Sequence, residues 1–199
     1  MTEYAAKHIV LAEKEQPQED AGVQDETVLI PVKYPEYANR LTNLALLMRN
    51  PKRDHDLVAL SVVYDDANID RQRAEGCKLL EQVTSYAASA DVKMHSQLRV
   101  ATNIANGIMH AFKEFRATEV VIGMHMHFSD STTFWGKFHQ SLFNGLSRQI
   151  IMARLMQPLS TLRRIVVCVP SRAQFEPGFY RWLERLSRLA ENLDCRIAY

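Results

Sequence analysis

The sequence of 199 residues lacks several features that define large classes of protein. No stretch approaches the ~18 consecutive apolar residues that a membrane-spanning helix needs, and no signal-peptide pattern opens the chain. The net charge is only +1 at pH 7, so the chain as a whole has no bulk electrostatic attraction to nucleic acid or to a membrane surface. We therefore expect no nucleic-acid partner and no direct insertion into a membrane.

Cysteine is scarce as well. The chain has three cysteines, Cys77, Cys168 and Cys195, and none of them belongs to a CxxC pair. Such residues are typical of reduced, mostly structural thiols in a cytosolic protein. The remaining composition, 47% hydrophobic and 24% charged, indicates an ordered protein with enough apolar residues for one complete core and part of a second.

Charge is unevenly distributed along the chain. Residues 1–26 contain two lysines against seven acidic residues, whereas residues 145–199 contain nine arginines, no lysine and four acidic residues. The opposite charges at the two ends suggest an interaction surface, or a contact between the ends themselves. A solvated helix face that carries arginines is the simpler alternative.

Apolar segments of strand length alternate with segments of helical periodicity. Strands are predicted over residues 28–32, 56–64, 92–98, 119–122 and 149–155. Apolar residues recur at helical spacing over 41–48, 70–89, 104–115 and 138–147. Because every connection carries a helix, the pattern predicts an α/β fold with a doubly wound, parallel, five-stranded sheet in the order 3-2-1-4-5 and right-handed crossovers.

A shorter copy of the same pattern follows. Residues 164–170 form another apolar run, and an apolar stripe then follows one helix over 179–193. We interpret residues 164–199 as the β-α-β start of a second copy of the domain. A unit of this size rarely sustains a core alone, so we expect Trp182, Leu186 and Leu189 to be buried against another surface.

These patterns divide the chain into four parts. Residues 1–26 are an N-terminal amphipathic segment and acidic linker, and residues 27–155 are the first complete domain. Residues 156–163 are a second linker, and residues 164–199 are the partial repeat.

The loop after the fourth predicted strand has a recognisable glycine spacing. Gly123 ends the apolar run, a polar loop follows, and Gly136-Lys137 stand at the head of the next helical segment. The unpaired N–H groups at such a helix start can bind a phosphate. The interval resembles the nucleotide loop of the universal stress protein family, in which GxxG is followed, after nine residues, by Gly and Ser or Thr. Met126 and Lys137 depart from that motif, since the family has Gly and Ser or Thr at their positions.

This resemblance covers residues 27–155 and includes the first strand, whose apolar run ends in Pro31-Val32 as in the family. In nucleotide-binding members the next residue is an Asp that contacts the nucleoside, whereas this chain has Lys33. The resemblance therefore implies a degenerate site for ATP or another adenine nucleotide. The residues that would form it are Lys33, Val62, Gly123, Met126, Gly136 and Lys137.

A narrower resemblance concerns the C-terminal part of the chain. Residues 157–167 and 175–179 are similar to the tandem cytosolic region, itself like universal stress proteins, at the C-terminus of bacterial sodium/proton antiporters, which exchange monovalent cations for protons. This resemblance implies that residues 1–26 are the remnant of a link to a transmembrane domain. The chain would then be a cytosolic piece of a longer protein.

The glycine loop also contains residues of other chemical types. Met124-His125-Met126-His127, with His139 nearby in sequence, supplies soft and borderline ligands suited to copper or zinc. No second cluster with ligand spacing accompanies them, so we expect packing methionines, surface imidazoles and no metal. The hydroxyls and carboxylate of residues 129–133 lack a positioned base, so we expect no catalytic residue and no enzymatic activity.

Two functions fit these observations. The first is a regulatory or interaction domain of a cation/proton antiporter, tethered at the cytoplasmic face of the membrane through the transmembrane domain of the same parent chain and able to sense a nucleotide or another small ligand. The second is a free-standing universal stress protein that binds ATP or another adenine nucleotide. In both cases we expect a homodimer.

Overall fold

The structure is a computed structural model of the chain. It describes residues 26–50, 55–124, 140–141, 146 and 148–199, and for His55 the backbone alone. The amphipathic segment predicted within residues 1–26 and most of the helix predicted over 138–147 lie outside the described residues.

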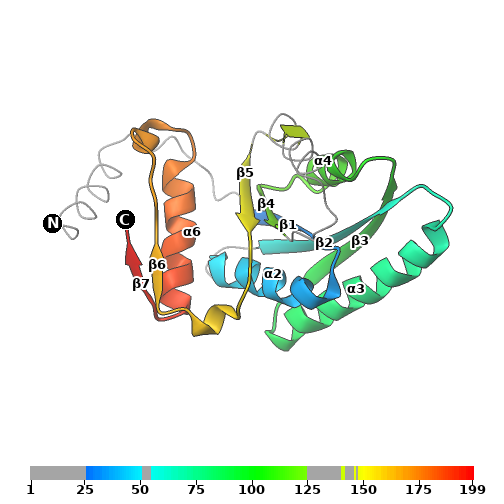
Figure 1. The fold of residues 1–199 in the computed structure, drawn as a ribbon, viewed down its shortest axis with the longest axis horizontal. Coiled ribbons are helices and arrows are strands. Elements are labelled where there is room, and N and C mark those ends of the chain that lie inside the picture. Colours follow the sequence, from blue (N-terminus) through cyan, green and yellow to red (C-terminus); the bar gives the residue numbers. More distant parts are fainter. Residues whose placement is uncertain (1–25, 51–54, 125–139, 142–145, 147) are drawn as a thin grey trace.

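A parallel five-stranded sheet forms the centre of the molecule. Its strands are β1 (Glu26–Pro31), β2 (His55–Tyr64), β3 (Met94–Ala101), β4 (Glu119–Gly123) and β5 (Gln149–Ala153). They are hydrogen-bonded in the order β3-β2-β1-β4-β5, and every adjacent pair is parallel (Figure 1). The predicted α/β class and strand order are therefore confirmed.

Helices cover both faces of this sheet. The helices α2 (Pro35–Met48) and α3 (Ile69–Ser89) pack on one face, and α4 (Ile104–Glu114) packs on the other. Successive strand residues alternate between the two layers, as Val28 and Ile30 of β1 contact the α2 and α3 side while Leu29 contacts the α4 side. Because both faces are buried, the strands β1 and β4 read as continuous apolar runs, which is why they were recognisable in the sequence.

The predicted boundaries are less accurate where apolar residues do not mark the element. The helix α2 begins at Pro35, several residues before the periodic leucines, because the fixed φ of proline suits the first turn of a helix. The strand β3 runs from Met94 to Ala101 instead of over 92–98. It is an edge strand whose side chains are mostly half-buried or exposed, so its sequence carries no long apolar run.

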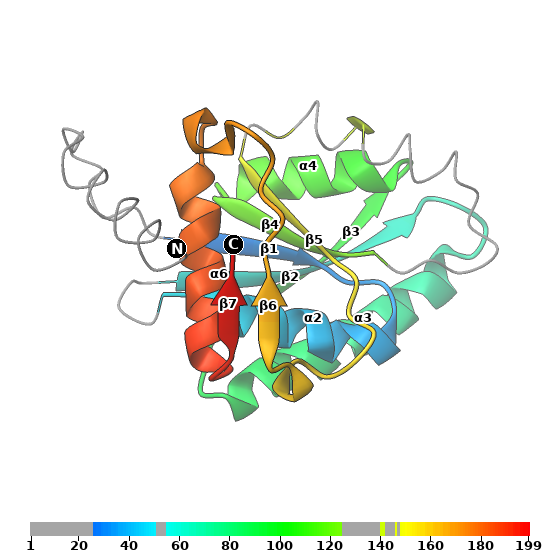
Figure 2. The same ribbon diagram turned by 60° about the vertical axis from the view of Figure 1, so that its left-hand side comes forward.

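The C-terminal part folds as a β-α-β unit. The 3-10 turn η1 (Leu159–Thr161) leads into β6 (Arg164–Val166), the turn η2 (Ala173–Phe175), the helix α6 (Phe179–Asn192) and β7 (Arg196–Ala198). The strands β6 and β7 are parallel and form a separate two-stranded sheet, with α6 between this sheet and the rest of the molecule (Figures 1 and 2). The order of elements is the one predicted for a second repeat.

The strand β6 is shorter than the apolar run over 164–170 that predicted it. Val167 donates its N–H to the carbonyl oxygen of Ala198 at 2.7 Å, and Ala198 is the last residue of β7. Without a longer partner strand, the apolar residues beyond Val167 cannot continue the ladder.

No helix in the described part of the chain combines the length and the apolar character that crossing a membrane requires.

Candidate functional site

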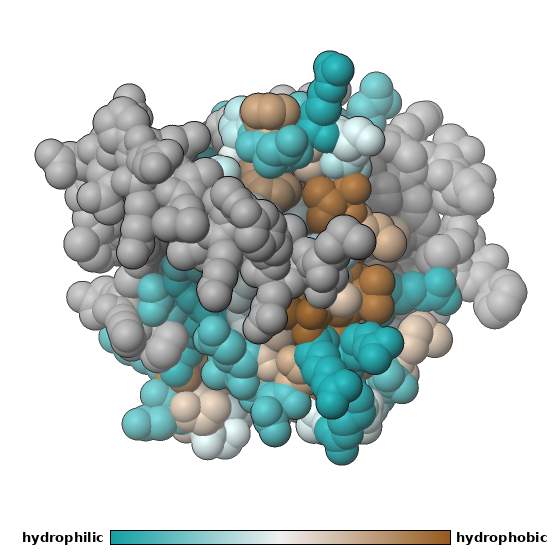
Figure 3. Space-filling view, turned by 90° about the vertical axis from the view of Figure 1, so that its left-hand side faces the viewer, coloured by the Kyte–Doolittle hydropathy of each residue, from teal (hydrophilic) through white to brown (hydrophobic). Residues whose placement is uncertain are grey.

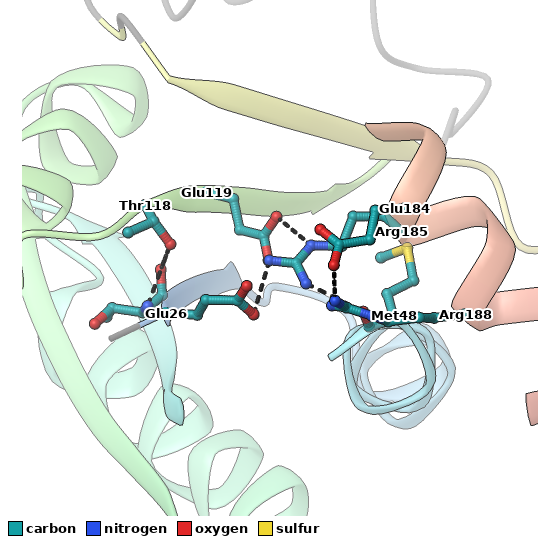
Figure 4. Close-up of polar contacts among 8 residues, drawn as sticks. Glu26, Met48, Thr118, Glu119, Glu184, Arg185 and Arg188 are labelled. Carbon is teal, nitrogen blue, oxygen red and sulfur yellow. Dashed lines mark hydrogen bonds and ion pairs between the residues drawn. The ribbon is translucent and has the colours of Figure 1, made fainter. Parts of the chain in front are cut away.

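The amino end of the sheet contains a buried group of charged side chains, which we call the Arg185 cluster: Arg185 of α6, Glu26 of β1 and Glu119 of β4. Arg185 Nη2 lies 2.9 Å from Glu26 Oε2, and Arg185 Nε donates to Glu119 Oε2 at 3.1 Å (Figure 4). Arg185 Nη1 also donates to the carbonyl oxygen of Met48, at the end of α2, at 3.4 Å. One guanidinium therefore joins three elements of the first domain to the C-terminal unit.

The three charged side chains are almost completely removed from water. The exposed fractions are 3% for Arg185, 3% for Glu119 and 5% for Glu26. Burial raises the pKa of the Glu119 carboxyl above its usual value, and this effect outweighs the opposing attraction of Arg185. Burial acts to lower the pKa of Arg185, but the two carboxylates outweigh it and raise that pKa. A cation that is surrounded in this way stays charged and holds its partners in place.

Further contacts fix α6 against the first domain. Asn192 Nδ2 donates to the carbonyl oxygen of Leu47 at 2.6 Å, and Leu189 is buried in the same core as the residues of α2 and α3. The prediction that the apolar stripe of α6 is buried is confirmed for Leu189. The prediction is wrong for Trp182 and Leu186, which are only half-buried, and Trp182 packs edge-on against Phe179 inside the C-terminal unit.

The C-terminal part of the chain exposes apolar residues. The large exposed hydrophobic side chains of the described residues all lie within 156–199, and they are Met156, Val166, Val169, Phe175 and Tyr199. Figure 3 views the molecule from the side on which β6 and β7 lie, and hydrophobic residues gather there between hydrophilic ones. In that sheet Ile165 packs toward the core, so its neighbour Val166 lies on the opposite face.

At the carboxyl end of the sheet, where the sequence predicted a ligand, the pairing between β1 and β4 ends early. Their described register covers only Val28 with Glu119 and Leu29 with Val120. Beyond it, Val32 donates to the carbonyl oxygen of Leu60 in β2, which turns the backbone of Pro31 toward β4. Proline has no N–H to donate, so the ladder to β4 ends there. The order of strands reverses at this point, which is where doubly wound sheets bind ligands.

Two of the predicted nucleotide-site residues lie at this end of β1 and β4. Gly123 is the last residue of β4, and Lys33 lies two residues beyond β1 with an exposed side chain. The Lys33 ammonium is 5.3 Å from the centre of the Tyr34 ring, a cation–π distance. Lys33 is therefore placed where a positive charge meets solvent.

Val62 belongs to the same predicted site but has a different environment. Its side chain packs under α4, and a Cβ added to Gly107 would lie 2.6 Å from Val62 Cγ1. Gly107 thus lets α4 approach β2 closely, and Val62 fills that contact. The other predicted residues, Met126, Gly136 and Lys137, lie outside the described residues, as do His125, His127 and His139 of the predicted metal ligands.

No family model matches the sequence. Solved structures do match the fold. A universal stress protein from Lactobacillus plantarum aligns with a TM-score of 0.53 and 16% identity, covering 66% of this chain and 99% of that one. The universal stress protein from Archaeoglobus fulgidus in complex with dAMP aligns with a TM-score of 0.51 and 14% identity, covering 65% of this chain and 98% of that one. The fold is that of the universal stress proteins.

The sequence is similar to part of a membrane transporter. The Na⁺/H⁺ antiporter NhaS5 of Synechocystis sp. is 23% identical over 166 residues, which are 81% of this chain and 24% of the antiporter. The chain thus spans about a quarter of that relative. The resemblances predicted from the sequence, to universal stress proteins and to a sodium/proton antiporter, are both confirmed.

Within this universal stress protein fold, the sequence analysis missed the Arg185 cluster. Arg185 lies three residues after Trp182 and four before Leu189, which places a charged residue inside the apolar stripe of α6. Glu119 lies two residues before the buried Val121 in β4, so both side chains are on the face of the sheet that α2 and α3 cover. A charged residue on an otherwise buried face was the available signal, because such a residue needs a partner of opposite charge.

Proposed function

We propose that the chain is a cytosolic regulatory or interaction region of a sodium/proton antiporter. The observation that carries this proposal is the extent of the two similarities. The solved universal stress proteins cover 65–66% of the chain, which corresponds to one domain, whereas the antiporter match covers 81%. The similarity to the antiporter therefore continues past a single universal stress protein domain.

The arrangement of the two units supports a role in transmitting or assembling rather than in catalysis. The Arg185 cluster ties the C-terminal unit to β1 and β4, so that a displacement of one unit would act on the other through a buried ion pair. The exposed apolar side chains of the C-terminal unit offer a surface for another protein segment. We propose that this partner is the transmembrane part of the same parent chain, at the cytoplasmic face of the membrane.

The first test concerns the size and location of the native protein. An antiserum raised against the purified chain is used on fractionated cells of the source organism. The proposal predicts a band several times heavier than the 22.8 kDa of this chain, in the membrane fraction. A band near 22.8 kDa in the soluble fraction would refute it.

The second test concerns regulation. Sodium-dependent proton movement is measured in vesicles that contain the full-length parent protein or a version lacking residues 27–199. The proposal predicts that the shortened version still transports but has altered activation or assembly. Identical transport, identical oligomeric state and identical ion dependence would contradict a regulatory or assembly role.

A free-standing universal stress protein that binds an adenine nucleotide is the second candidate. It is favoured by the early end of the β1–β4 pairing at the strand-order reversal, by Gly123 at the end of β4, and by the dAMP-bound protein of the same fold. Calorimetric titration of the chain with ATP, AMP and dAMP tests it. If a nucleotide binds, Lys137→Glu should weaken binding more than tenfold, about 1.4 kcal/mol or more, because it places a repelling charge at the predicted helix start. Met126→Gly should leave binding unchanged or improve it, by letting the backbone approach the phosphates.

The two candidates give separable results. Nucleotide binding by a small soluble native protein supports the second and excludes the first. Nucleotide binding by a large membrane protein supports a ligand-sensing antiporter region. The absence of heat with every nucleotide at millimolar concentration removes the nucleotide role and leaves the antiporter assignment to the fractionation and transport tests.

A further inference from the structure

The two-stranded sheet of β6 and β7 has one covered face and one uncovered face. Ile165 of β6 packs toward the core, on the side of α6. Because side chains alternate along a strand, the neighbours of Ile165 and of its partner Ile197 lie on the opposite face, which we call the outer face. The residues of the outer face are Arg164 and Val166 of β6 and Arg196 and Ala198 of β7.

The first domain shows how such a face is completed. There, Leu29 of β1 lies on the face opposite α2 and is completely buried beneath α4. In the C-terminal unit, by contrast, Val166 is 67% exposed, and Arg164 and Arg196 are exposed as well. No described residue covers the outer face as α4 covers β1. An exposed apolar side chain within a charged rim marks a place of contact.

The outer face is positively charged at one end and apolar at the other. The register places Arg164 directly across from Arg196 at the amino ends of the two strands, which lie about 4.8 Å apart. Neither guanidinium forms an ion pair with a described residue. Like charges across a sheet repel each other, and the outer face of a second copy would add two more. The complementary partner is therefore acidic beside the arginines and apolar beside Val166.

The amino-terminal segment, residues 1–25, has this composition. It contains six acidic residues against two lysines. Residues 9–12 are an uninterrupted apolar block, and residues 13–20 follow with four of the acidic residues. These residues lie outside the described part of the structure. Their sequence places an apolar block next to an acidic block, which is the charge pattern that the outer face requires.

Glu26 fixes the point at which this segment is attached. Its carboxylate lies 2.9 Å from Arg185 of α6, and the β6–β7 sheet lies on the far side of that helix (Figures 1 and 2). Residues 13–25 can span up to roughly 40 Å, whereas a helix and the sheet beside it are together about 20 Å thick. The apolar block can therefore reach the outer face. Because a tether of this kind gives an effective concentration of about millimolar, weak contacts are sufficient.

We infer that the amino-terminal segment docks on the outer face of the β6–β7 sheet, with residues 9–12 over its apolar end and residues 13–20 beside Arg164 and Arg196. Docking covers the face of the C-terminal unit that α4 covers in the first domain. A partner that binds this face has to displace the segment first, so the segment controls access to it. Such docking does not require the antiporter assignment.

The thiol of Cys168 reports on this docking. Cys168 lies two positions after Val166, just beyond the end of β6, and the described residues leave it exposed. Cys77 on α3 is also exposed and serves as an internal reference in the same molecule. Alkylation of both thiols in the full chain is followed by mass spectrometry, and the ratio of the two rates measures how far the outer face is covered.

Charge reversal in the segment tests the proposed contact. In Glu13→Lys/Glu15→Lys, the rate at Cys168 relative to the reference should rise at least about threefold, because repulsion replaces attraction at Arg164 and Arg196. High salt should raise the same ratio in the wild-type protein, since it screens surface ion pairs. An unchanged ratio in the variant would overturn the inference.

Charge reversal on the sheet supplies the complementary arm. Arg164→Glu/Arg196→Glu should also raise the ratio, although the new carboxylates disfavour the reactive thiolate of Cys168. Combining it with the segment variant should restore the slow rate, and failure to restore it would contradict the contact. Glu36→Lys/Asp65→Lys reverses two exposed charges at the carboxyl end of the five-stranded sheet and is the matched control, in which the ratio should not change.

A direct measurement covers the case in which a variant does not fold. In Cys77→Ser/Cys195→Ser, a nitroxide on Cys168 should broaden the NMR signals of residues 9–15, whereas in Cys168→Ser/Cys195→Ser a nitroxide on Cys77 should not. Absence of broadening from Cys168 would refute the docking. Broadening that occurs only between spin-labelled and isotope-labelled copies would assign the outer face to a second copy and would refute it as well.

Discussion

The two ends of the same parallel sheet are built in opposite ways. At the carboxyl end, the described pairing of β1 with β4 ends at Leu29, and Lys33 beyond β1 is exposed. At the amino end, the same two strands are closed by Arg185 from a distant helix. The carboxyl end lies where doubly wound sheets bind ligands, whereas the amino end is tied to the C-terminal unit by a buried ion pair.

This difference indicates that the amino end of the sheet tolerates substitution less well than the carboxyl end. A buried ion pair that bridges two units fixes their relative position, and its partners cannot be changed singly without leaving a charge in the interior. An exposed lysine at an open edge can be replaced with little effect on folding. The substitutions below are expected to separate the two ends by the size of their effects.

The largest effect is expected for Arg185→Ala. It leaves the carboxylates of Glu26 and Glu119 without their shared cation, and breaking a buried ion pair in this way costs about 3–5 kcal/mol. Arg181→Ala, on the same helix but at an exposed position, is the matched control and should change the stability by less than about 0.5 kcal/mol. Urea unfolding measures the free energy of unfolding of both variants. Equal losses would show that the buried Arg185 contributes no more to stability than an exposed arginine of the same helix.

An intermediate effect is expected for Gly107→Ala in α4. Alanine is the better helix former by about 1 kcal/mol, but its Cβ would lie 2.6 Å from Val62 Cγ1. Overpacking of this kind costs about 1–3 kcal/mol, so we expect a net loss of stability. In a Val62→Ala background the same substitution should cost less stability, with the contact to Ala101 Cβ at 3.2 Å remaining. If it is equally destabilising there, Val62 is not the residue that limits the approach of α4.

The smallest effect is expected for Lys33→Ala. The side chain is exposed beyond the end of β1, so the stability should change by no more than about 0.5 kcal/mol in thermal unfolding. A larger loss would show that the carboxyl end is also structurally constrained, and the comparison between the ends would fail.

The sequence predicted the fold well because the first domain consists of apolar runs and helical stripes of ordinary length. Strands such as β1 and β4, buried on both faces, could be located by their valines and isoleucines, and the glycine at the end of β4 located the loop. The edge strand β3 and the first turn of α2 were placed less accurately, since exposed or capping residues mark them only weakly.

The charged interface could not be predicted in the same way. Glu119 and Arg185 are 66 positions apart, and their pairing depends on how α6 packs against α2, which no local pattern specifies. Val62 illustrates the converse case. It was assigned to a ligand site from a resemblance, but its position against Gly107 gives it a packing role that only the three-dimensional structure reveals.

The central claim is that Arg185 and Glu119 join the C-terminal unit to the domain of the five-stranded sheet. A double-mutant cycle tests it most directly, using Arg185→Ala, Glu119→Ala and the combination, with stabilities from urea unfolding at one pH. We predict an interaction energy of at least about 1 kcal/mol, with the double variant less destabilised than the sum of the single variants, because the second substitution removes a charge that the first left unpaired. Simple additivity of the two substitutions would show that the residues do not interact and would contradict the account.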